Sequence, residues 1–587
     1  MARQSGVRLV LSLIGVAVVV SVIGIVLMFL VVSRGPAVPA AATLVLRPGG
    51  SLPEVEPSDV LGQVLQRDAN TVGGLVDALR KAARDPRVRA VLLKPGALDA
   101  PYWGKLQELR DAVVDFRESG KTVVAFLEYG GDREYYLASA ANRVYLLPSS
   151  PLDLTGVATF EIFLRGALDK VGAVPDYVHV GEYKAAPNQM TESGFTDTHR
   201  EMSESINTDM YEQLVEAIAS SRGKTAAEVR ALIDQGPFVP DAALSAGLVD
   251  GLAYEDQLGA LVPELDDAAG ARRIEGTDYR RVTAESVGFR PRARVAVLYA
   301  VGTIVSGRSG YDALSGSVIG SDTIVEEIRK IREDSSIRAI VLRIDSPGGS
   351  SVASDVIWRE LMLTREDNPS RPIVASMSDL AASGGYYIAM PSDAIVAQPG
   401  TLTGSIGIYG GKIAIGGVLE KLGVTTETVA SGANAGIYSP FVPFTPGQRA
   451  ELQRFMESFY EGFVRKAAES RGTTPEQIAA VAQGRVWTGR QALEHGLVDA
   501  LGGLDVAITL AKERASIPAD EDVQLVVFPR RRTLFEAFGD QFGTSGTVWS
   551  ALVGQSAPAS AIASLAGPAR LFRRGEPLAL MPFSLVR

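Results

Sequence analysis

The chain has 587 residues, of which 46 % are hydrophobic and 21 % charged; this is ordinary globular composition, but the chain is too long for one hydrophobic core. Its formal net charge of −10 argues against nucleic acid as the main partner, because phosphate binding needs a basic face. The absence of cysteine excludes disulfides, thiolate metal sites and a cysteine nucleophile, and only three histidines are available as a base.

The first predicted element is a membrane anchor. Leu9 to Val32 is an uncharged apolar run that, as a helix, would span roughly 36 Å and cross a hydrocarbon core of about 30 Å. Arg3 and Arg8 precede it and favour an amino terminus on the cytoplasmic side. The alternative is a cleaved signal peptide with its site near Ala40–Ala42, although signal-peptide cores are only about 7–15 residues long. We therefore expect a cytoplasmic terminus, a transmembrane helix and a tether within residues 1–42.

The rest of the chain contains a duplicated domain. Residues 75–93, L-V-D-A-L-R-K-A-A-R-D-P-R-V-R-A-V-L-L, match residues 324–342, I-V-E-E-I-R-K-I-R-E-D-S-S-I-R-A-I-V-L, at a constant offset of 249 positions. A period of this length is too long for a solenoid and indicates two tandem domains. The expected parts are a first domain at 43–265, a linker at 266–291, a second domain at 292–520 and a C-terminal extension at 521–587.

The second copy shows the alternation of strands and helices most clearly. Strands are predicted at 294–300, 338–344 and 372–377, and helices at 323–332, 445–470 and 475–482. The near-continuous apolar run from Arg338 to Ile344 is typical of a strand that is buried on both faces. This alternation predicts an α/β fold with parallel sheets and crossover helices in each copy.

The tail after Pro529 has weak periodicity. Arg530–Arg532 and the apolar stretch 551–571 could contact the membrane surface. We expect instead a loosely packed surface extension.

Two glycine-rich turns in the second copy follow predicted strands. Asp345–Ser350, D-S-P-G-G-S, would leave backbone N–H groups open to a phosphate or a developing oxyanion, but it lacks the spacing of known phosphate loops. Asp379–Tyr386, D-L-A-A-S-G-G-Y, presents Ser383 between small residues, as a strand-to-helix nucleophile turn does. The structural alternative for Ser383 is a helix N-cap.

The first copy differs from the second in a complementary way. It has Asp132 where the second copy has Ser383, but its segment 181–186, G-E-Y-K-A-A, carries Lys184 where the second copy has G-A-N-A. A serine hydroxyl needs an adjacent base, and a lysine serves only when its pKa, ordinarily about 10.4, is lowered by burial. Glu182 would oppose that shift if it pointed inward, and a solvated surface lysine is the alternative for Lys184.

The ordered motifs G-E-Y-K, D-S-P-G-G, A-A-S-G-G-Y and T-L-T-G-S-I-G resemble those of the signal peptide peptidase A family, in its long form with a duplicated domain. This resemblance implies a bacterial serine endopeptidase with a crotonase/Clp-like fold in both copies. It implies Lys184 as general base, Ser383 as nucleophile and Ser405 as a hydrogen-bonding partner of the lysine amine. It also implies an oxyanion hole made by backbone N–H groups of Gly348, Gly349 and Gly384.

The expected activity is peptide-bond hydrolysis through an acyl-enzyme, with no metal and no cofactor. The resemblance implies remnant signal peptides or other extended apolar peptides as substrates, and a homo-oligomer such as a tetramer. With the N-terminal helix as anchor, it also implies the bacterial inner membrane, with the catalytic part facing the periplasm or the cell exterior.

Three other interpretations stay open. A Ser–His–Asp triad would have to use His179, expected to be structural, or His199 and His495, which fall in helical, surface-like contexts. An acyl-CoA enzyme of the same superfold would share the glycine oxyanion hole. A catalytically silent membrane scaffold would keep the fold without the chemistry.

Overall fold

The computed structural model describes residues 37–55, 70–265, 272–312, 316–530 and 576–582, together with positions 24 and 572 and the pair 585–586. The predicted anchor at Leu9–Val32 lies outside these residues apart from position 24. Among the residues that are described, no helix is both long and apolar enough to cross a membrane.

The first copy is built around a six-stranded sheet in which all neighbouring strands are parallel. Its order is β10-β1-β2-β3-β5-β9, with β1 (Ala42–Leu46), β2 (Val88–Leu93), β3 (Thr122–Leu127), β5 (Arg143–Leu146), β9 (Gly251–Leu252) and β10 (Arg272–Glu275). One face packs against α3 (Val72–Arg84), α4 (Gly104–Glu118), α5 (Asp132–Ala138) and α8 (Asp197–Arg222), and the other against α11 (Leu258–Leu261). Because both faces are covered, the inner strands are mostly apolar, with Arg89 and Arg143 exposed near strand starts.

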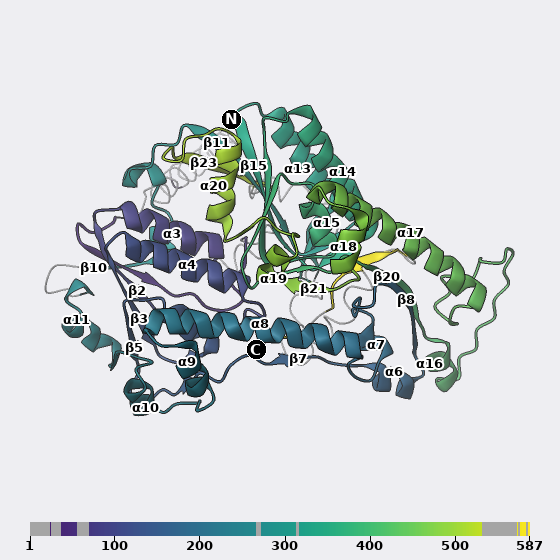
Figure 1. The fold of residues 1–587 in the computed structure, drawn as a ribbon, viewed down its shortest axis with the longest axis horizontal. Coiled ribbons are helices and arrows are strands. Elements are labelled where there is room, and N and C mark those ends of the chain that lie inside the picture. The colour runs from purple at the N-terminus through teal and green to yellow at the C-terminus, as the bar shows by residue number, and fades with distance from the viewer. Residues whose placement is uncertain are drawn as a thin grey trace, which may run out of the picture.

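The second copy repeats this order as β23-β11-β15-β17-β18-β22, again with parallel pairs. The strands are β11 (Ala293–Val301), β15 (Ile337–Ser346), β17 (Ile373–Ala382), β18 (Ala394–Ala397), β22 (Ala500–Leu501) and β23 (Val523–Phe528). Helices α13 (Ser321–Glu333), α14 (Ser351–Asp367) and α15 (Gly384–Ala389) cover one face, and α20 (Leu504–Arg514) covers the other (Figure 1). The matching strand orders confirm the predicted duplication and the parallel α/β architecture.

The remaining elements connect these layers. In the first copy they are β4 (Gly130–Gly131), β6 (Leu152–Asp153), β7 (Thr159–Phe160), α6 (Arg165–Val171), α7 (Asn188–Thr191), α9 (Ala226–Ile233), α10 (Pro240–Ser245) and α12 (Gly276–Tyr279). In the second they are β12 (Thr303–Val305), β13 (Gly310–Asp312), β14 (Gly316–Gly320), β19 (Leu402–Gly404), α16 (Gly416–Lys421), α17 (Pro446–Arg471), α18 (Pro475–Val481), β21 (Val486–Thr488) and α19 (Gly489–Glu494).

The structure extends both sheets past the expected domain limits. Strand β10 lies inside the predicted linker, yet it pairs with β1 along four residues, and β23 lies beyond residue 520 and pairs with β11. Only Ile274 of β10 is buried. A short charged edge strand of this kind has no apolar pattern to reveal it in the sequence.

A third sheet joins the two copies. Its order is β13-β14-β12-β16-β24-β20-β8, in which β8 (Val174–Val180) of the first copy pairs antiparallel with β20 (Ile408–Ala414) of the second over seven residue pairs. Strand β24 (Leu578–Leu580) lies beside β20, and β16 (Gly348–Ser350) lies on the other side of β24. In Figure 1 the long helix α8 of the first copy crosses the lower half of the molecule and extends below the second copy. Residues far apart in the chain therefore meet at the seam between the copies.

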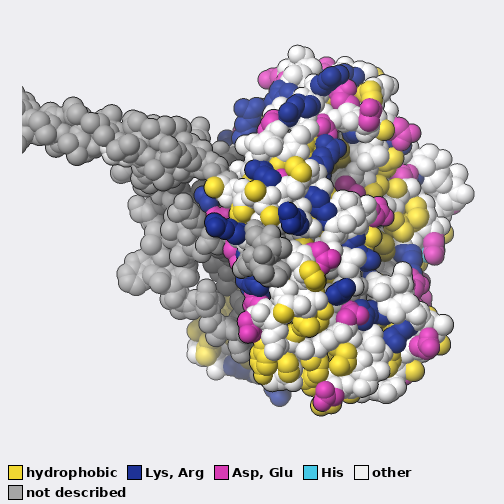
Figure 2. Space-filling model, turned by 90° about the vertical axis from the view of Figure 1, so that its left-hand side faces the viewer, with side chains coloured by type: hydrophobic (Ala, Val, Ile, Leu, Met, Phe, Trp, Pro, Cys, Tyr) yellow, Lys and Arg dark blue, Asp and Glu magenta, His cyan; other side chains and the backbone are white. Residues whose placement is uncertain are grey.

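Buried charges also link the copies. Arg343 of β15 is 1 % exposed; its guanidinium donates to Glu54 over 2.8 and 2.9 Å and to Glu108 of α4 over 2.5 Å. On the outside, Figure 2 shows acidic and basic side chains interspersed over one face, with apolar side chains gathered towards its lower edge.

Candidate active site

Ser383 stands at the turn where β17 ends and α15 begins. All ten residues of β17 are buried, so the turn at its end lies in the interior of the protein. Ser383 has φ 57° and ψ −110°, a strained conformation for a residue with a side chain. Its backbone N–H donates to the carbonyl oxygen of Gly404 over 2.8 Å. The residue occupies the N-cap position of α15, but its side chain makes no capping hydrogen bond, so the hydroxyl is not used for the structural role.

Lys184 lies in the turn that follows β8. The backbone N–H of Tyr183 donates to the carbonyl oxygen of Gln483 over 2.8 Å, which ties this turn to the second copy. Glycine at 484 makes the contact possible, because a Cβ there would lie 2.6 Å from the Cβ of Lys184. A Cβ on Gly407 would lie 3.1 Å from the Cδ of the same side chain. The side chain of Lys184 therefore packs closely against the backbones of Gly407 and Gly484.

The amine of Lys184 ends beside Ser383. Its Nζ lies 2.8 Å from Ser383 Oγ, 3.0 Å from Ser405 Oγ and 3.1 Å from the Ser405 carbonyl oxygen. A neutral amine has two N–H donors and one lone pair, so the two Ser405 oxygens can accept both hydrogens. The lone pair then remains for the Ser383 hydroxyl proton. Lys184 and Ser383 meet within a single chain, one from each copy.

The surroundings of Lys184 favour the neutral amine. The residue is 1 % exposed, and burial lowers the pKa of its amine well below the usual value. Glu182, which could have opposed this shift, is exposed at the surface. A neutral amine at ordinary pH is the protonation state that a general base needs.

Three glycines lie close together in the two turns, one of them next to Ser383 in the chain. Gly348 and Gly349 have φ of 102° and 153°, values that favour glycine, and a Cβ on Gly349 would lie 2.1 Å from the carbonyl oxygen of Ile304. A Cβ on Gly384, the residue after Ser383, would lie 3.1 Å from the nitrogen of Gly349. The Gly348 N–H donates elsewhere, to Ser346 Oγ over 3.2 Å. Gly349 and Gly384, two of the three glycines expected to form the oxyanion hole, therefore have their backbones close together.

A buried ion cluster beneath the two glycine-rich turns was not assigned from the sequence. Lys105 of α4 lies 2.6 Å from Asp345 and 3.3 Å from Asp379, and these are the first residues of the two motifs. Burial alone would lower the pKa of Lys105, but the two carboxylates hold it above its usual value. Asp345 also accepts the backbone N–H of Leu380 over 3.2 Å. The first copy therefore fixes the position of both turns of the second; the paired aspartates were the only signal of this in the sequence.

The first copy holds a non-catalytic counterpart of the Ser383 turn. Asp132 begins α5, and its carboxylate accepts the backbone N–H groups of Thr155 and Gly156, each over 2.9 Å. These residues correspond to Thr403 and Gly404 of the second copy. Asp132 therefore locks a loop that in the second copy is held through the backbone of Ser383.

The histidines occupy structural positions. His199 was expected in a surface-like context; this is wrong, because it is fully buried in α8, with Nε2 2.8 Å from Glu161 and its ring against Phe163 and Phe195. Its partners come from a separate segment, so its own helical pattern could not reveal the burial. His179 Nδ1 lies 3.2 Å from the Gly181 carbonyl oxygen. The ring of His495 packs against Trp487 at 4.1 Å between centroids.

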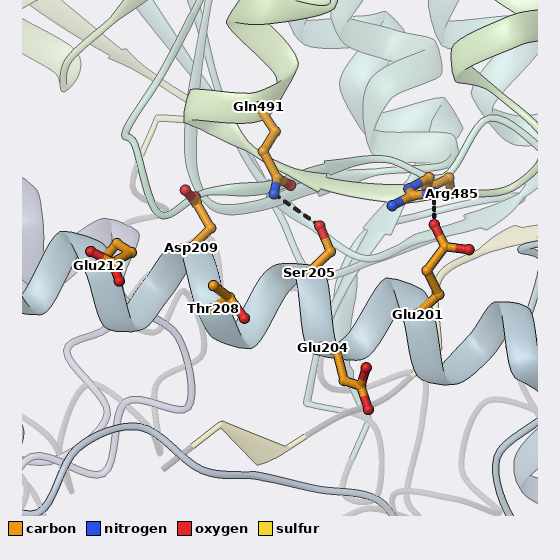
Figure 3. A pocket seen from close by; sticks show the side chains of 8 residues that line it. All are labelled: Glu201, Glu204, Ser205, Thr208, Asp209, Glu212, Arg485 and Gln491. Atoms are coloured by element: carbon orange, nitrogen blue, oxygen red, sulfur yellow. Dashed lines mark hydrogen bonds and ion pairs between the residues drawn. The ribbon is translucent and has the colours of Figure 1, made fainter. Parts of the chain in front are cut away.

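A shallow groove of about 500 Å³ lies between α8 and the second copy (Figure 3). Its side chains are mostly acidic or polar: Glu201, Glu204, Ser205, Thr208, Asp209, Glu212, Arg485 and Gln491. Arg485 donates to Glu201 over 2.7 Å and Gln491 donates to Ser205 over 3.1 Å, both across the copies. These contacts hold the halves together. Within the described part of the chain, no cluster of three or more histidine and carboxylate side chains could hold a metal ion.

Comparison with known proteins identifies related sequences. The model of peptidase family S49 matches residues 115–269 and 365–518, one match in each copy. The chain is 36 % identical over 458 residues to the chloroplastic serine protease SPPA of Arabidopsis thaliana, covering 77 % of this chain and 67 % of that protein. It is 34 % identical over 460 residues to protease 4 of Salmonella typhi, covering 76 % of this chain and 72 % of that protein.

Among solved structures, a membrane-bound stomatin-specific protease is 16 % identical, with a TM-score of 0.26, over 41 % of this chain and 100 % of that one.

Proposed function

The chain belongs to peptidase family S49 and is a serine protease, and from this premise we propose that it cuts peptide bonds with a Ser383–Lys184 dyad. The observation that carries the proposal is the 2.8 Å contact between Lys184 Nζ and Ser383 Oγ in a fully buried setting. Burial supplies the low amine pKa, and the glycine turns supply backbone donors beside the hydroxyl.

In the proposed mechanism, neutral Lys184 takes the Ser383 proton as Oγ attacks the carbonyl carbon of the substrate. The N–H groups of Gly349 and Gly384 hold the oxyanion, a contribution that typically changes rates by about 10²–10³-fold. The lysine then protonates the leaving amine, and in the second half it activates the water that releases the acyl group. Ser405 keeps the amine aimed at Ser383, because it accepts both amine hydrogens.

The proposed substrates are extended apolar peptides, including remnant signal peptides. Strand β16 pairs antiparallel with the extended segment β24, and main-chain hydrogen bonds of this kind are how a strand takes up an extended peptide. We also propose the crotonase/Clp-like form of the α/β fold for each copy. The apolar run at Leu9–Val32 supports an anchor in the bacterial inner membrane, with the domains on the periplasmic or outer side.

A homo-oligomer, such as a tetramer, is proposed from an apolar region at one end of the molecule. Leu422, Val424 and Val429 follow α16 and are 72 %, 48 % and 102 % exposed. Apolar side chains gathered in one loop are typical of a surface that another protein covers. Sedimentation of the full chain in detergent, beside a variant with these residues changed to serine, measures whether they hold copies together.

The test of the dyad is labelling by a serine-reactive fluorophosphonate, with the modified residue identified by mass spectrometry. We expect a label on Ser383 that disappears in Ser383→Ala and forms far more slowly in Lys184→Ala. Ser439→Ala, on the loop between α16 and α17, is the control and should label like the parent. A label on another serine, or none on any, would contradict the proposed site and favour the silent scaffold; binding of coenzyme A would favour the acyl-CoA enzyme.

A further inference from the structure

One short segment of the second copy contacts both turns that carry the proposed base and its hydrogen-bonding partner. Residues 483–485 lie between α18 and β21. The carbonyl oxygen of Gln483 accepts the backbone N–H of Tyr183 over 2.8 Å, and the carbonyl oxygen of Arg485 accepts the backbone N–H of Ser405 over 2.7 Å. The segment therefore joins a turn of the first copy to a turn of the second.

The backbone on both sides of this junction is strained. Gln483 has φ 55° and Ser405 has φ 50°, a left-handed conformation that is unfavourable for residues with a side chain. Such a conformation persists only where its surroundings fix it. The turn of the base packs directly on the strained residue, because a Cβ on Gly181 would lie 2.5 Å from the carbonyl oxygen of Gln483. Contacts that fix residues 483–485 therefore also fix the turn of the base.

The side chain of Arg485 supplies such contacts. Its guanidinium lies over two rings, 4.6 Å from the ring centroid of Tyr183 and 4.4 Å from that of Trp487. It also donates to Glu201 over 2.7 Å, and the hydroxyl of Tyr183 donates to the same carboxylate over 2.9 Å. Figure 3 shows Arg485 and Glu201 facing each other at one end of the groove. Three side chains thus form a closed set of contacts across the two copies.

This set of contacts acts on the residue next to the base. Tyr183 and Lys184 are adjacent, so an orientation fixed for the tyrosine also fixes the peptide from which the lysine side chain extends. The lysine Nζ has to stay 2.8 Å from Ser383 Oγ and 3.0 Å from Ser405 Oγ. A misplacement of about 1 Å at reacting atoms can cost 10²-fold in rate. A looser turn would also admit water to an amine whose low pKa depends on burial.

We propose that Arg485 is a positioning residue that holds the Lys184 amine against Ser383 and away from water. It acts through the ring of Tyr183 and through the backbone of Ser405. The proposal rests on the Ser383–Lys184 dyad proposed above and adds a residue that supports it from outside the reacting groups.

The chain offers a matched control five residues further on. Arg490 also pairs across the copies with helix α8, with Asp209 over 2.6 Å and with Glu216 over 2.8 Å. Its backbone N–H donates to the carbonyl oxygen of Pro399 over 3.1 Å, away from the turn of the base. Arg490 therefore joins the same two copies by the same kind of contact at a different place.

The experiment compares the full chain, purified in detergent, with Arg485→Met, Arg485→Lys and Arg490→Met. The readouts are kcat and KM on a fluorogenic apolar peptide and the rate of fluorophosphonate labelling, each from about pH 7 to about pH 9.5. The final extent of labelling gives the folded, active fraction, so that kcat refers to active protein alone.

The groups around Arg485 do not titrate in this range. Hydrogen bonds from Arg485 and Tyr183 lower the pKa of Glu201, so its carboxylate stays ionised. Burial and the hydrogen bond to Glu201 raise the pKa of Tyr183, so its hydroxyl stays neutral. The ring of His495, which packs against Trp487, has its pKa lowered by burial and is neutral as well. A pH dependence of the rate in this range therefore reports the amine.

We expect Arg485→Met to lower kcat about tenfold or more at pH 7, with KM changed less than about twofold. The loss should shrink as pH rises, because an amine in contact with water has a higher pKa and loses its proton only at higher pH. Arg485→Lys should restore part of the loss, since it keeps a cation over the rings. Arg490→Met should keep the kcat and the pH profile of the parent.

Glu201→Gln, at an exposed carboxylate, is the second variant and covers the case in which Arg485→Met does not fold. It should move kcat and the pH profile in the same direction by a smaller factor. Unchanged readouts in both variants, a loss that is equal at every pH, or the same loss in Arg490→Met would overturn the inference and leave the dyad standing. A parent that neither hydrolyses the peptide nor takes the label at Ser383 would overturn the dyad as well.

Discussion

Replacing Lys184 by methionine should abolish activity and should change how stability depends on pH. Methionine, one atom shorter than lysine, keeps an unbranched apolar side chain against Gly407 and Gly484 but cannot take a proton. Loss of a general base costs roughly 10²–10⁴-fold in rate. The same change removes the free-energy cost of deprotonating the Lys184 amine when the chain folds and buries it.

The sign of the pH effect follows from the direction of the pKa shift. The folded-state pKa of Lys184 is lowered by burial, whereas the unfolded value is about 10.4. Between those two values the unfolded chain binds one more proton than the folded one, so the stability of the parent rises with pH by about 1.4 kcal/mol per pH unit. The methionine variant lacks this term, and the hydrogen bonds it loses at Ser383 and Ser405 add an offset that does not vary with pH.

The assay is urea unfolding of the full chain in detergent, followed by tryptophan fluorescence at a series of pH values. We expect the stability of the parent to gain on that of Lys184→Met as pH rises, until the pH approaches the unfolded pKa. Lys330→Met, at an exposed lysine of α13, is the control for loss of a positive charge. A difference between parent and Lys184→Met that stays constant with pH would refute the buried neutral amine.

Three further substitutions test the support of the site. Ser405→Ala removes one of the amine's acceptors and should lower kcat/KM by about fivefold, the effect of roughly 1 kcal/mol, with the protein still folded by circular dichroism. Gly349→Ala should lower kcat about 10²-fold or more because its Cβ meets a backbone oxygen at 2.1 Å, whereas Gly436→Ala, in open space, should be neutral. Lys105→Met should lower the free energy of unfolding by about 3–5 kcal/mol, since it leaves two buried carboxylates unpaired. Arg454→Ala, in an exposed pair, should change it by less than about 1 kcal/mol in the same urea titration.

Much of the fold could be predicted because buried parallel strands have apolar sequences. The apolar run at 338–344 predicted β15, which is buried as its sequence indicates. The constant offset predicted the duplication, which the matching strand orders of the two sheets confirm. The edge strand β10 could not be predicted, since its sequence R-R-I-E has a single buried residue. Strand β24 could not be predicted either, because it has only three residues and pairs with β16 and β20, which are far away in the sequence.

In the candidate site, too, some residues could be predicted from the sequence and others could not. Ser383 and Lys184 were recognisable from motifs in two different copies, and they remain proposals for catalysis that the geometry supports. Lys105 carried no signal, because a lysine on an amphipathic helix is ordinarily solvated and only the seam between the copies buries it. His199 was misplaced for a related reason: its burial comes from Glu161, Phe163 and Phe195 rather than from its own helix.

The most direct test of the account is hydrolysis of a fluorogenic apolar peptide by the full chain, measured beside Ser383→Ala and Lys184→Ala. The account predicts an active parent and two folded variants that each lose activity by a factor of about 10² or more. It also predicts that the activity of the parent rises with pH through the lowered pKa of Lys184. Full activity in Lys184→Ala would contradict the dyad and place the base elsewhere.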